Sequence, residues 1–400
     1  MTTSRSRDYV LSDIDHHADY FVEHNYEIYE ELRAECPIAH STAHDGFYIF
    51  LDYDTVYSAD HDVETFSSAP GRNVPAGDTP PQFVPLDSDP PLHTQYRRIG
   101  VPYFSPKLAK QDEPYFRSVA TELIDEFIES GEADIVGQLT TPLPAIWILK
   151  MLGFDETRWA DWVGWVHTMI HDRHSEHALA ARDNVVKTVF EEINLRRTEG
   201  FRDDLLSVIM QGRVDGEPLP DHLIFTYAHL MLIGGMDTTS GLTGNALVQL
   251  IRQPELRERL IREPSILPQA TEEFLRHDTP AQTQGRTVTK DCVYKGQEFK
   301  AGDKVLLSHA AANRDPKVFP DPDKIDFDRK PNRHIAFGVG PHRCLGSHHA
   351  KVMFEVMISE ILSRLPDFTL AGDIEYFPDG GDVWAVRRLP IRFTPGPRSR

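Results

Sequence analysis

Apolar residues recur at helical spacing over most of this chain of 400 residues. Apolar positions at i, i+3, i+4 and i+7 predict amphipathic α-helices. The longest such segment contains the stretch HLMLIGGMDTTSGL, which is apolar on nearly all sides, so we expect that helix to run through the interior. The predicted helices are residues 105–131, 134–153, 155–171, 178–200, 220–253, 254–264, 267–278 and 345–365.

Strand-like runs are fewer and shorter, and most of them lie near residue 300. They are rich in β-branched and aromatic residues and are bounded by turn signals such as KGQ and AGD, which predicts a small sheet there. The predicted strands are GFYIFL (46–51), RTVT (286–289), DCVY (291–294), KVLLS (304–308) and WAVRRLPIRF (384–393). The fold class is therefore mainly α with small β sheets. We find no repeat and no linker, so we expect a single domain over residues 1–400.

One long segment fits no helix or strand. Residues 66–91 contain seven prolines and show no periodicity. A loop of this length inside a compact domain is typically a lid, a binding loop or disordered. We expect it to cover a substrate site, with a solvated surface loop as the alternative.

Charge and cysteine content exclude several classes of protein. The net charge of −20 argues against a nucleic-acid-binding protein, which would carry a basic stripe. Three widely spaced cysteines do not form a disulfide framework, so a reducing compartment is expected. No segment has the length and apolar character of a signal peptide or a membrane span, so we expect a cytoplasmic protein without membrane contact.

Cys344 lies in the glycine-rich stretch FGVGPHRCLG, residues 337–346, directly before a predicted helix. The unpaired N–H groups and the dipole at a helix N-terminus favour a thiolate over a thiol. Three interpretations are open at this point. Cys344 could be a buried structural cysteine, a zinc ligand together with His348 and His349, or an axial thiolate ligand of haem iron.

The predicted interior helix 220–253 carries features that need an explanation. Gly234 and Gly235 each cost roughly 1 kcal/mol relative to alanine within a helix. Close approach of a flat ligand and tight helix packing would each explain them. Asp237 and Thr238 then place an acid beside an alcohol in an apolar helix, and the threonine hydroxyl can bond back to the carbonyl at i−4.

Two further pairs of residues stand at helical spacing. Glu273 and Arg276 lie at i and i+3 and can form an ion pair, which would be of small value on a surface. His93 and Arg97 lie at i and i+4 on a helix opened by two prolines. Each of these residues alone would be a solvated side chain.

Taken together, these motifs identify a resemblance. Phe337, Gly340, His342, Cys344 and Gly346 are similar to the haem-binding signature of the cytochrome P450 family. Other family motifs follow in order over roughly residues 66–393, and jointly they are specific. The resemblance implies a single-domain, mainly α fold and thiolate-ligated haem b (iron protoporphyrin IX), with Cys344 as the iron ligand.

The resemblance also implies roles for the other residues. Thr238 would hydrogen-bond the bound oxygen molecule and a water, and Asp237 would relay protons. Glu273 and Arg276 would form a buried structural trio with His334 or, as second choice, Arg329. The residues expected to hold the cofactor are His93, Arg97, Gly234, Arg286, Phe337, His342 and Cys344, of which His93, Arg97, Arg286 and His342 would bind the propionates.

We therefore expect a monooxygenase that uses O2 and NAD(P)H through a separate ferredoxin reductase and ferredoxin, because the chain has no flavin or iron–sulfur motif. From Arg329 to Phe354 there are five Lys/Arg and no Asp/Glu, a basic stretch that could dock an acidic ferredoxin or could reflect chance clustering. The alternatives are a peroxygenase driven by H2O2, a non-catalytic haem sensor and, remotely, a zinc hydrolase.

By position in the family, the substrate pocket would draw on residues 66–91, 160–185, 234–238, 279–284 and a turn near Val383. These stretches are mostly apolar or small. The expected substrate is a small hydrophobic organic molecule, a terpenoid or an aromatic compound, which would be hydroxylated or epoxidised.

Overall fold

The computed structural model describes residues 9–75, 83–171 and 175–399. Part of the predicted covering loop, residues 76–82, lies outside the described residues. The helices are α1 (Asp19–Glu35), α2 (Tyr53–His61), α3 (Leu92–Gly100), α4 (Pro106–Phe127), α5 (Pro142–Leu152), α6 (Trp159–His171), α7 (His177–Glu199), α8 (Leu205–Gln211), α9 (Asp221–Arg252), α10 (Pro254–Arg262), α11 (Leu267–His277), α12 (His309–Ala312) and α13 (Ser347–Arg364).

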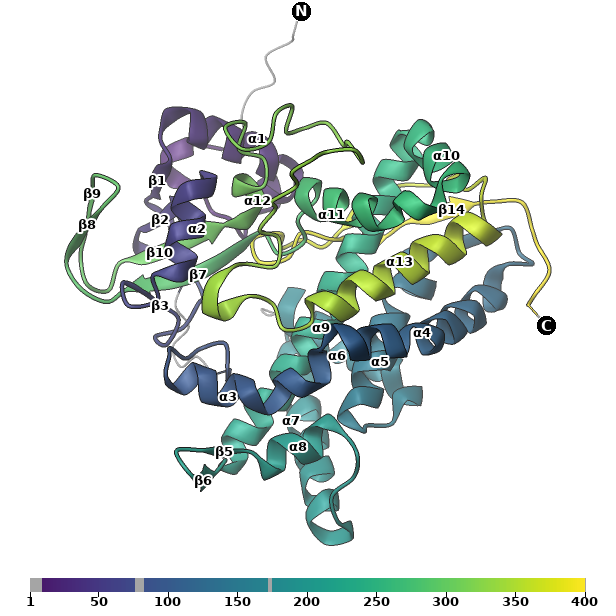
Figure 1. The fold of residues 1–400 in the computed structure, drawn as a ribbon, viewed down its shortest axis with the longest axis horizontal. Coiled ribbons are helices and arrows are strands. Elements are labelled where there is room, and N and C mark those ends of the chain that lie inside the picture. The colour runs from purple at the N-terminus through teal and green to yellow at the C-terminus, as the bar shows by residue number, and fades with distance from the viewer. Residues whose placement is uncertain (1–8, 76–82, 172–174, 400) are drawn as a thin grey trace, which may run out of the picture.

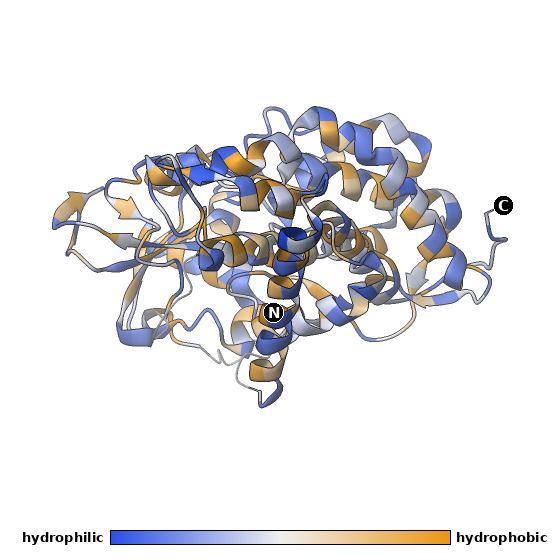
Figure 2. Cartoon of the chain, turned by 90° about the horizontal axis from the view of Figure 1, so that it is seen from below, coloured by the Kyte–Doolittle hydropathy of each residue, from blue (hydrophilic) through white to orange (hydrophobic). Residues whose placement is uncertain are grey.

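Helix α9 is the longest and crosses the middle of the molecule (Figure 1). It contacts α5, α6, α7, α8, α10 and α13, so nearly every face of it is covered. This arrangement confirms the expectation drawn from its continuous apolar pattern. The main hydrophobic core gathers around α9, while the surrounding helices change from hydrophobic to hydrophilic around their circumference (Figure 2).

A five-stranded sheet lies beside α1 and α2, on the left in Figure 1. Its order is β1 (Ile38–Ser41), β2 (Phe47–Phe50), β10 (Lys304–Ser308), β7 (Thr283–Val288) and β3 (Phe66–Ser67). The β2–β10 pair is parallel and the other pairs are antiparallel. Strands β10 and β7 therefore lie between the N-terminal hairpin and the 66–91 segment, whose first two residues form a strand that its sequence did not predict.

Smaller sheets account for the remaining strands. The β8 (Cys292–Tyr294) and β9 (Gln297–Phe299) hairpin pairs within itself, so residues 291–294 do not join the sheet near residue 300 as expected. The predicted strand 384–393 is two strands in different sheets. Strand β13 (Val386–Arg388) pairs with β12 (Glu375–Tyr376), and β14 (Pro390–Arg392) pairs with β11 (Thr369–Leu370) and β4 (Glu132–Asp134).

The predicted helix 134–153 is also wrong in its first half. Residues Val136–Thr140 form a short π-helical turn, and α5 begins only at Pro142. Proline lacks the N–H that an interior helical position would donate, and its fixed φ suits a first helical position. A short hairpin, β5 (Arg213–Val214) with β6 (Glu217–Pro218), precedes α9. Among the described residues, no helix is both long and apolar enough to cross a membrane.

Candidate haem-thiolate site

A cavity of about 300 Å³ lies between α9 and the glycine-rich segment before α13. Helix α9 contributes Gly234 and Thr238 to its wall, and the segment contributes Phe337, Cys344 and Gly346. These two parts of the chain lie roughly one hundred positions apart. The structure thus brings the two strongest sequence motifs together around one space of the size usual for a ligand pocket.

The glycine-rich turn owes its shape to two glycines. Gly338 and Gly340 have φ of 64° and 69°, in the left-handed region that favours glycine. A Cβ on Gly340 would also lie 2.6 Å from the carbonyl oxygen of Asp60. Gly346 is different, because a Cβ there would meet open space and the residue lines the cavity. Gly346 therefore leaves room for a ligand, whereas the positive φ of Gly338 and Gly340 serves the backbone turn.

The Cys344 N–H donates to the carbonyl oxygen of Phe337 at 2.8 Å, which fixes the cysteine in the cavity wall. Burial raises the pKa of the Cys344 thiol, although backbone N–H groups of Gly346 and Ser347 and the guanidinium groups of Arg97 and Arg343 act in the opposite direction. The backbone N–H groups at the start of the helix thus favour the thiolate, as expected, while burial opposes it. A metal cation at the sulfur would deprotonate it outright.

Cationic and imidazole side chains converge on one side of the same cavity. His93 and Arg97 come from α3, Arg286 comes from β7, and His342 lies two residues before Cys344. The His93 and His342 rings lie 4.3 Å apart, centroid to centroid. Burial and then Arg97 lower the pKa of His93 to about 4, and burial and then Arg286 lower the pKa of His342 to about 3. Both imidazoles are therefore neutral donors at pH 7.

Three buried nitrogen atoms in this group lack a hydrogen-bond partner within the described part of the chain: Nδ1 of His93, Nε of Arg286 and Nε2 of His342. Buried polar atoms in proteins are almost always paired. Unpaired donors beside two guanidinium groups fit an anionic ligand such as a pair of carboxylates. The donor set therefore fits the propionates of haem, with Cys344 as the soft ligand for its iron.

Asp60 was not predicted from sequence, and its carboxylate binds Arg286 of this group. Its two carboxylate oxygens accept from Arg286 Nη2 at 3.0 Å and from His309 Nε2 at 2.7 Å. Burial alone would raise the pKa of Asp60, but His309 and Arg286 hold that pKa below its usual range. Asp60 thus holds Nη2 of Arg286, whereas Nε of Arg286 has no partner among the described residues. Nothing in the local sequence around Asp60 distinguishes it from a surface helix residue.

On α9, Thr238 lines the cavity and its hydroxyl donates to the carbonyl oxygen of Gly234 at 3.1 Å. The back-bond is as expected, but α9 continues without a break through this turn. A Cβ on Gly234 would meet open space, whereas one on Gly235 would lie 3.3 Å from Ile148. The tight-packing explanation therefore applies to Gly235, whereas Gly234 lines the cavity, as the flat-ligand explanation requires.

Asp237 is absent from the cavity wall and is bound by two histidines of α6. His167 Nε2 lies 2.8 Å from one carboxylate oxygen and His171 Nε2 lies 3.3 Å from the other. Burial alone would raise the pKa of Asp237, but these two hydrogen bonds hold that pKa well below its usual range. His167 and His171 were missed from sequence, although their spacing of one helical turn was a usable signal.

Glu273 and Arg276 on α11 are fully buried and bidentate, with both N–O distances 2.8 Å. The third member of this group is Arg329, whose Nε lies 3.1 Å from Glu273 Oε1. The choice of His334 was wrong, because its Nε2 bonds Glu272 on the adjacent helix position at 2.7 Å. The buried group ties α11 to the segment that leads into Cys344.

The zinc interpretation finds no support at Cys344. His349 stacks on Trp147 at 4.6 Å and its Nε2 lies 3.3 Å from Asp112 of α4. In the described residues, Cys344 belongs to no cluster of potential metal ligands with His348 and His349.

The cavity wall follows the expected pocket in part. Pro85 and Leu86 from the covering segment line it, as do Pro280, Ala281 and Gln284 from residues 279–284. Among the described residues, none from 160–185 reaches the cavity; that segment supplies the two histidines on Asp237 instead. Val383 does not line it either and forms a β-bridge with Ala281.

A cysteine that faces a cavity beside unpaired donors for two carboxylates is typical of a haem-thiolate protein. Comparison with known proteins agrees: the family model "Cytochrome P450" matches residues 143–370. Cytochrome P450 130 of Mycobacterium tuberculosis is 31% identical over 92% of this chain and 95% of its own. Steroid C26-monooxygenase of M. tuberculosis is 33% identical over 92% and 94%, respectively. The chain belongs to the cytochrome P450 family and is a monooxygenase with thiolate-ligated haem.

Among solved structures, CYP109E1 of Bacillus megaterium, determined in complex with testosterone, superposes with a TM-score of 0.87. It is 28% identical in sequence, and the match covers 94% of this chain and 99% of that one. The mainly helical fold with small sheets is therefore the cytochrome P450 fold.

Proposed function

We propose that this monooxygenase inserts one oxygen atom from O2 into a hydrophobic terpenoid-type substrate, steroids included, by hydroxylation or epoxidation. The observation that supports this proposal is the apolar wall beside Thr238, which includes Pro85, Leu86, Leu230 and Met231. Such a wall favours a substrate that buries hydrocarbon and carries little charge. The relatives named for steroid oxidation and for a testosterone complex point to the same class.

A binding screen tests this proposal. The haem-loaded enzyme is titrated with steroids, smaller terpenoids, simple aromatics and fatty acids, and the shift of the haem Soret band is recorded. We expect saturable shifts with members of the steroid or terpenoid sets and NADH-dependent products from the same compounds. Binding confined to fatty acids or aromatics would overturn the substrate class while leaving the family assignment intact.

Bound haem supplies the activation of O2 and the transfer of one oxygen atom to the substrate. The chain itself supplies protons on the α9 side. We propose that protons enter at His167, whose side chain is 25% exposed, and pass through the Asp237 carboxylate toward the Thr238 hydroxyl in the cavity. Because Asp237 is strongly anionic, the imidazole nitrogens of His167 and His171 are the groups that hold the transferable proton.

Electrons come from a separate ferredoxin and its NAD(P)H-dependent reductase in this proposal. Of the basic residues near Cys344, Lys330, Arg333 and Arg343 are exposed. Arg329 binds Glu273 and Lys351 binds Glu272 at 2.9 Å, so these two serve the fold. Three exposed cations in a chain of net charge −20 form a surface that favours an acidic partner.

Charge reversal tests this surface. Arg343→Glu and Arg333→Glu should each slow reduction by an acidic ferredoxin by about tenfold at low salt, with the difference fading as salt rises. Lys290→Glu, an equal charge change at an exposed position before β8, should leave the rate unchanged. Equal slowing by all three variants would show a net-charge effect and remove the docking surface. Turnover with H2O2 alone as fast as with the electron chain would instead favour a peroxygenase.

A further inference from the structure

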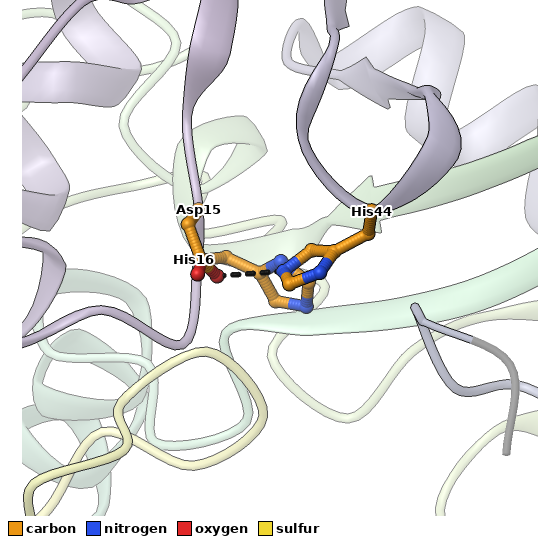
Figure 3. Close-up of side chains that lie close together, drawn as sticks. All are labelled: Asp15, His16 and His44. Carbon is orange, nitrogen blue, oxygen red and sulfur yellow. Dashed lines mark hydrogen bonds and ion pairs between the residues drawn. The ribbon is translucent and has the colours of Figure 1, made fainter.

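A group of potential metal ligands, none of which lines the haem cavity, lies at the N-terminal edge of the five-stranded sheet. Asp15 and His16 precede α1, and His44 lies in the β1–β2 connection (Figure 3). One ligand atom from each of the three side chains lies within 4.8 Å of the other two. Figure 3 shows the Asp15 carboxylate and the two imidazoles converging from the two segments. We propose that Asp15, His16 and His44 bind a divalent transition-metal ion of the zinc type.

The donor set favours this class of ion. Two imidazole nitrogens and one carboxylate oxygen are typical ligands of Zn²⁺ and of neighbouring first-row metals, whereas Mg²⁺ and Ca²⁺ prefer oxygen alone. Zinc bonds of about 2.0 Å in a tetrahedron place the ligand atoms about 3.3 Å apart. Ligand atoms that lie up to 4.8 Å apart would therefore have to close by up to about 1.5 Å. Water would complete a tetrahedral site, because the Asp15 and His44 side chains are 37% and 22% exposed.

Two nitrogen atoms lie within hydrogen-bond distance of the Asp15 carboxylate. Asp15 Oδ1 accepts from the His17 backbone N–H at 2.9 Å and lies 2.8 Å from His44 Nε2. An incoming metal ion would take the place of the proton between Asp15 and His44, and that proton would leave to solvent or move to the other ring nitrogen.

Other contacts hold the two segments together before any metal arrives. Ser41 Oγ donates to the carbonyl oxygen of Ile14 at 2.8 Å, and Thr42 N–H donates to that of Ser12 at 2.9 Å. His44 itself has φ 53° and ψ 43°, a left-handed conformation that is uncommon outside glycine and asparagine. The backbone therefore presents His44 toward Asp15 at some conformational cost, as is frequent at binding sites.

His17, which follows the proposed ligand His16, connects the site to the 66–91 segment. His17 bonds Asp379 through Nδ1 at 2.8 Å and the carbonyl oxygen of Val74 through Nε2 at 2.8 Å. Both ring nitrogens of His17 thus have other partners, so His17 is not a ligand. Because it joins the metal-binding segment to the 66–91 segment, a metal ion here would stabilise the attachment of that segment.

Zinc titration of the haem-loaded, chelator-treated enzyme tests the site. Isothermal titration calorimetry with ZnCl2 should show one equivalent bound with micromolar affinity, and Co²⁺ in its place should give the absorption of a tetrahedral site. Asp15→Asn and His44→Asn should each weaken this binding by about tenfold or more. Asparagine tolerates the left-handed conformation at residue 44, so the second variant keeps the loop.

The control variant is His24→Ala, which removes an α1 histidine that is paired with Glu27 rather than with this cluster. It should bind zinc as the wild type does. Zinc should also raise the melting temperature of the wild type and of His24→Ala, but not of the two ligand variants. Absence of micromolar binding, or binding that neither ligand variant weakens, would overturn the site and leave Asp15–His44 as a simple ion pair.

Discussion

Replacing Asp237 with asparagine isolates the charge of the proton-delivery group. The amide has the same shape as the carboxylate and can still accept from one histidine and donate to the other. Because both contacts remain and only their charge is lost, the change costs at most about 3 kcal/mol of folding free energy, so the variant should fold and bind haem.

The expected effect on catalysis is larger. Positioned proton transfer contributes roughly 10²–10⁴-fold to rate, which corresponds to about 2.7–5.4 kcal/mol of barrier. The amide of the variant cannot pass on a proton from His167, which lies 2.8 Å from the native carboxylate, or from His171, which lies 3.3 Å from it. Product formation should therefore fall by at least about 10²-fold, and its solvent deuterium isotope effect should rise.

Asp278→Asn is the matched control, because Asp278 is a buried carboxylate whose oxygen lies 2.8 Å from a histidine nitrogen, on His277, away from the cavity wall. The assay records product, NADH and the substrate-induced Soret shift for both variants. An unchanged rate and isotope effect in Asp237→Asn, or equal losses in both variants, would refute the proton-delivery role.

Further predictions concern the same helix and the network before Cys344. Thr238→Ala should divert electrons to peroxide and lower product per NADH by about tenfold, whereas Thr243→Ala, which removes a similar back-bond of 2.9 Å outside the cavity, should not. Glu273→Gln should lower the free energy of unfolding by about 3 kcal/mol or more in denaturant titrations, because it leaves buried arginines without their anion; the adjacent Glu272→Gln, partly exposed and screened, should lose under about 1 kcal/mol. Burial alone would raise the pKa of Glu272, but His334 and Lys351 lower it from 4.5 to about 2. The stabilising contribution of Glu272 is therefore present above pH 4.5 and is lost as the pH falls toward 2. The difference in stability between wild type and Glu272→Gln should shrink over that interval; a constant difference would contradict it.

Residues with a local sequence signal were predicted well. The glycine-rich turn, the Asp237–Thr238 pair and the α3 pair of His93 and Arg97 each stand at a spacing that local geometry imposes. The turn, Thr238, His93 and Arg97 line one cavity, and Asp237 lies outside its lining and is bound by His167.

Residues whose roles depend on distant partners were not predictable in this way. Asp60 reaches Arg286 across 226 positions, and His167 reaches Asp237 across 70. Sequence also could not choose between His334 and Arg329 as the partner of Glu273, since both lie in the same irregular segment. The π-helical turn before α5 was missed because apolar periodicity continues through it, while the hydrogen-bond pattern changes.

The state of the cysteine illustrates the same limit. A helix N-terminus favours a thiolate and burial opposes it, and the balance depends on groups such as Arg97 that only the folded chain brings near Cys344. Iron bound at the sulfur would favour the thiolate further. Cys344→Ser should therefore lose the thiolate-ligated haem spectrum while keeping the fold, as checked by circular dichroism.

Turnover under ¹⁸O2 tests the central claim most directly. A steroid or terpenoid that shifts the Soret band is incubated with the enzyme, a ferredoxin, its reductase and NAD(P)H, and the product is analysed by mass spectrometry. We predict one ¹⁸O atom in each product molecule and near-stoichiometric consumption of NAD(P)H. Product that carries oxygen from water, or NAD(P)H consumption that yields only peroxide with every bound compound, would contradict the account.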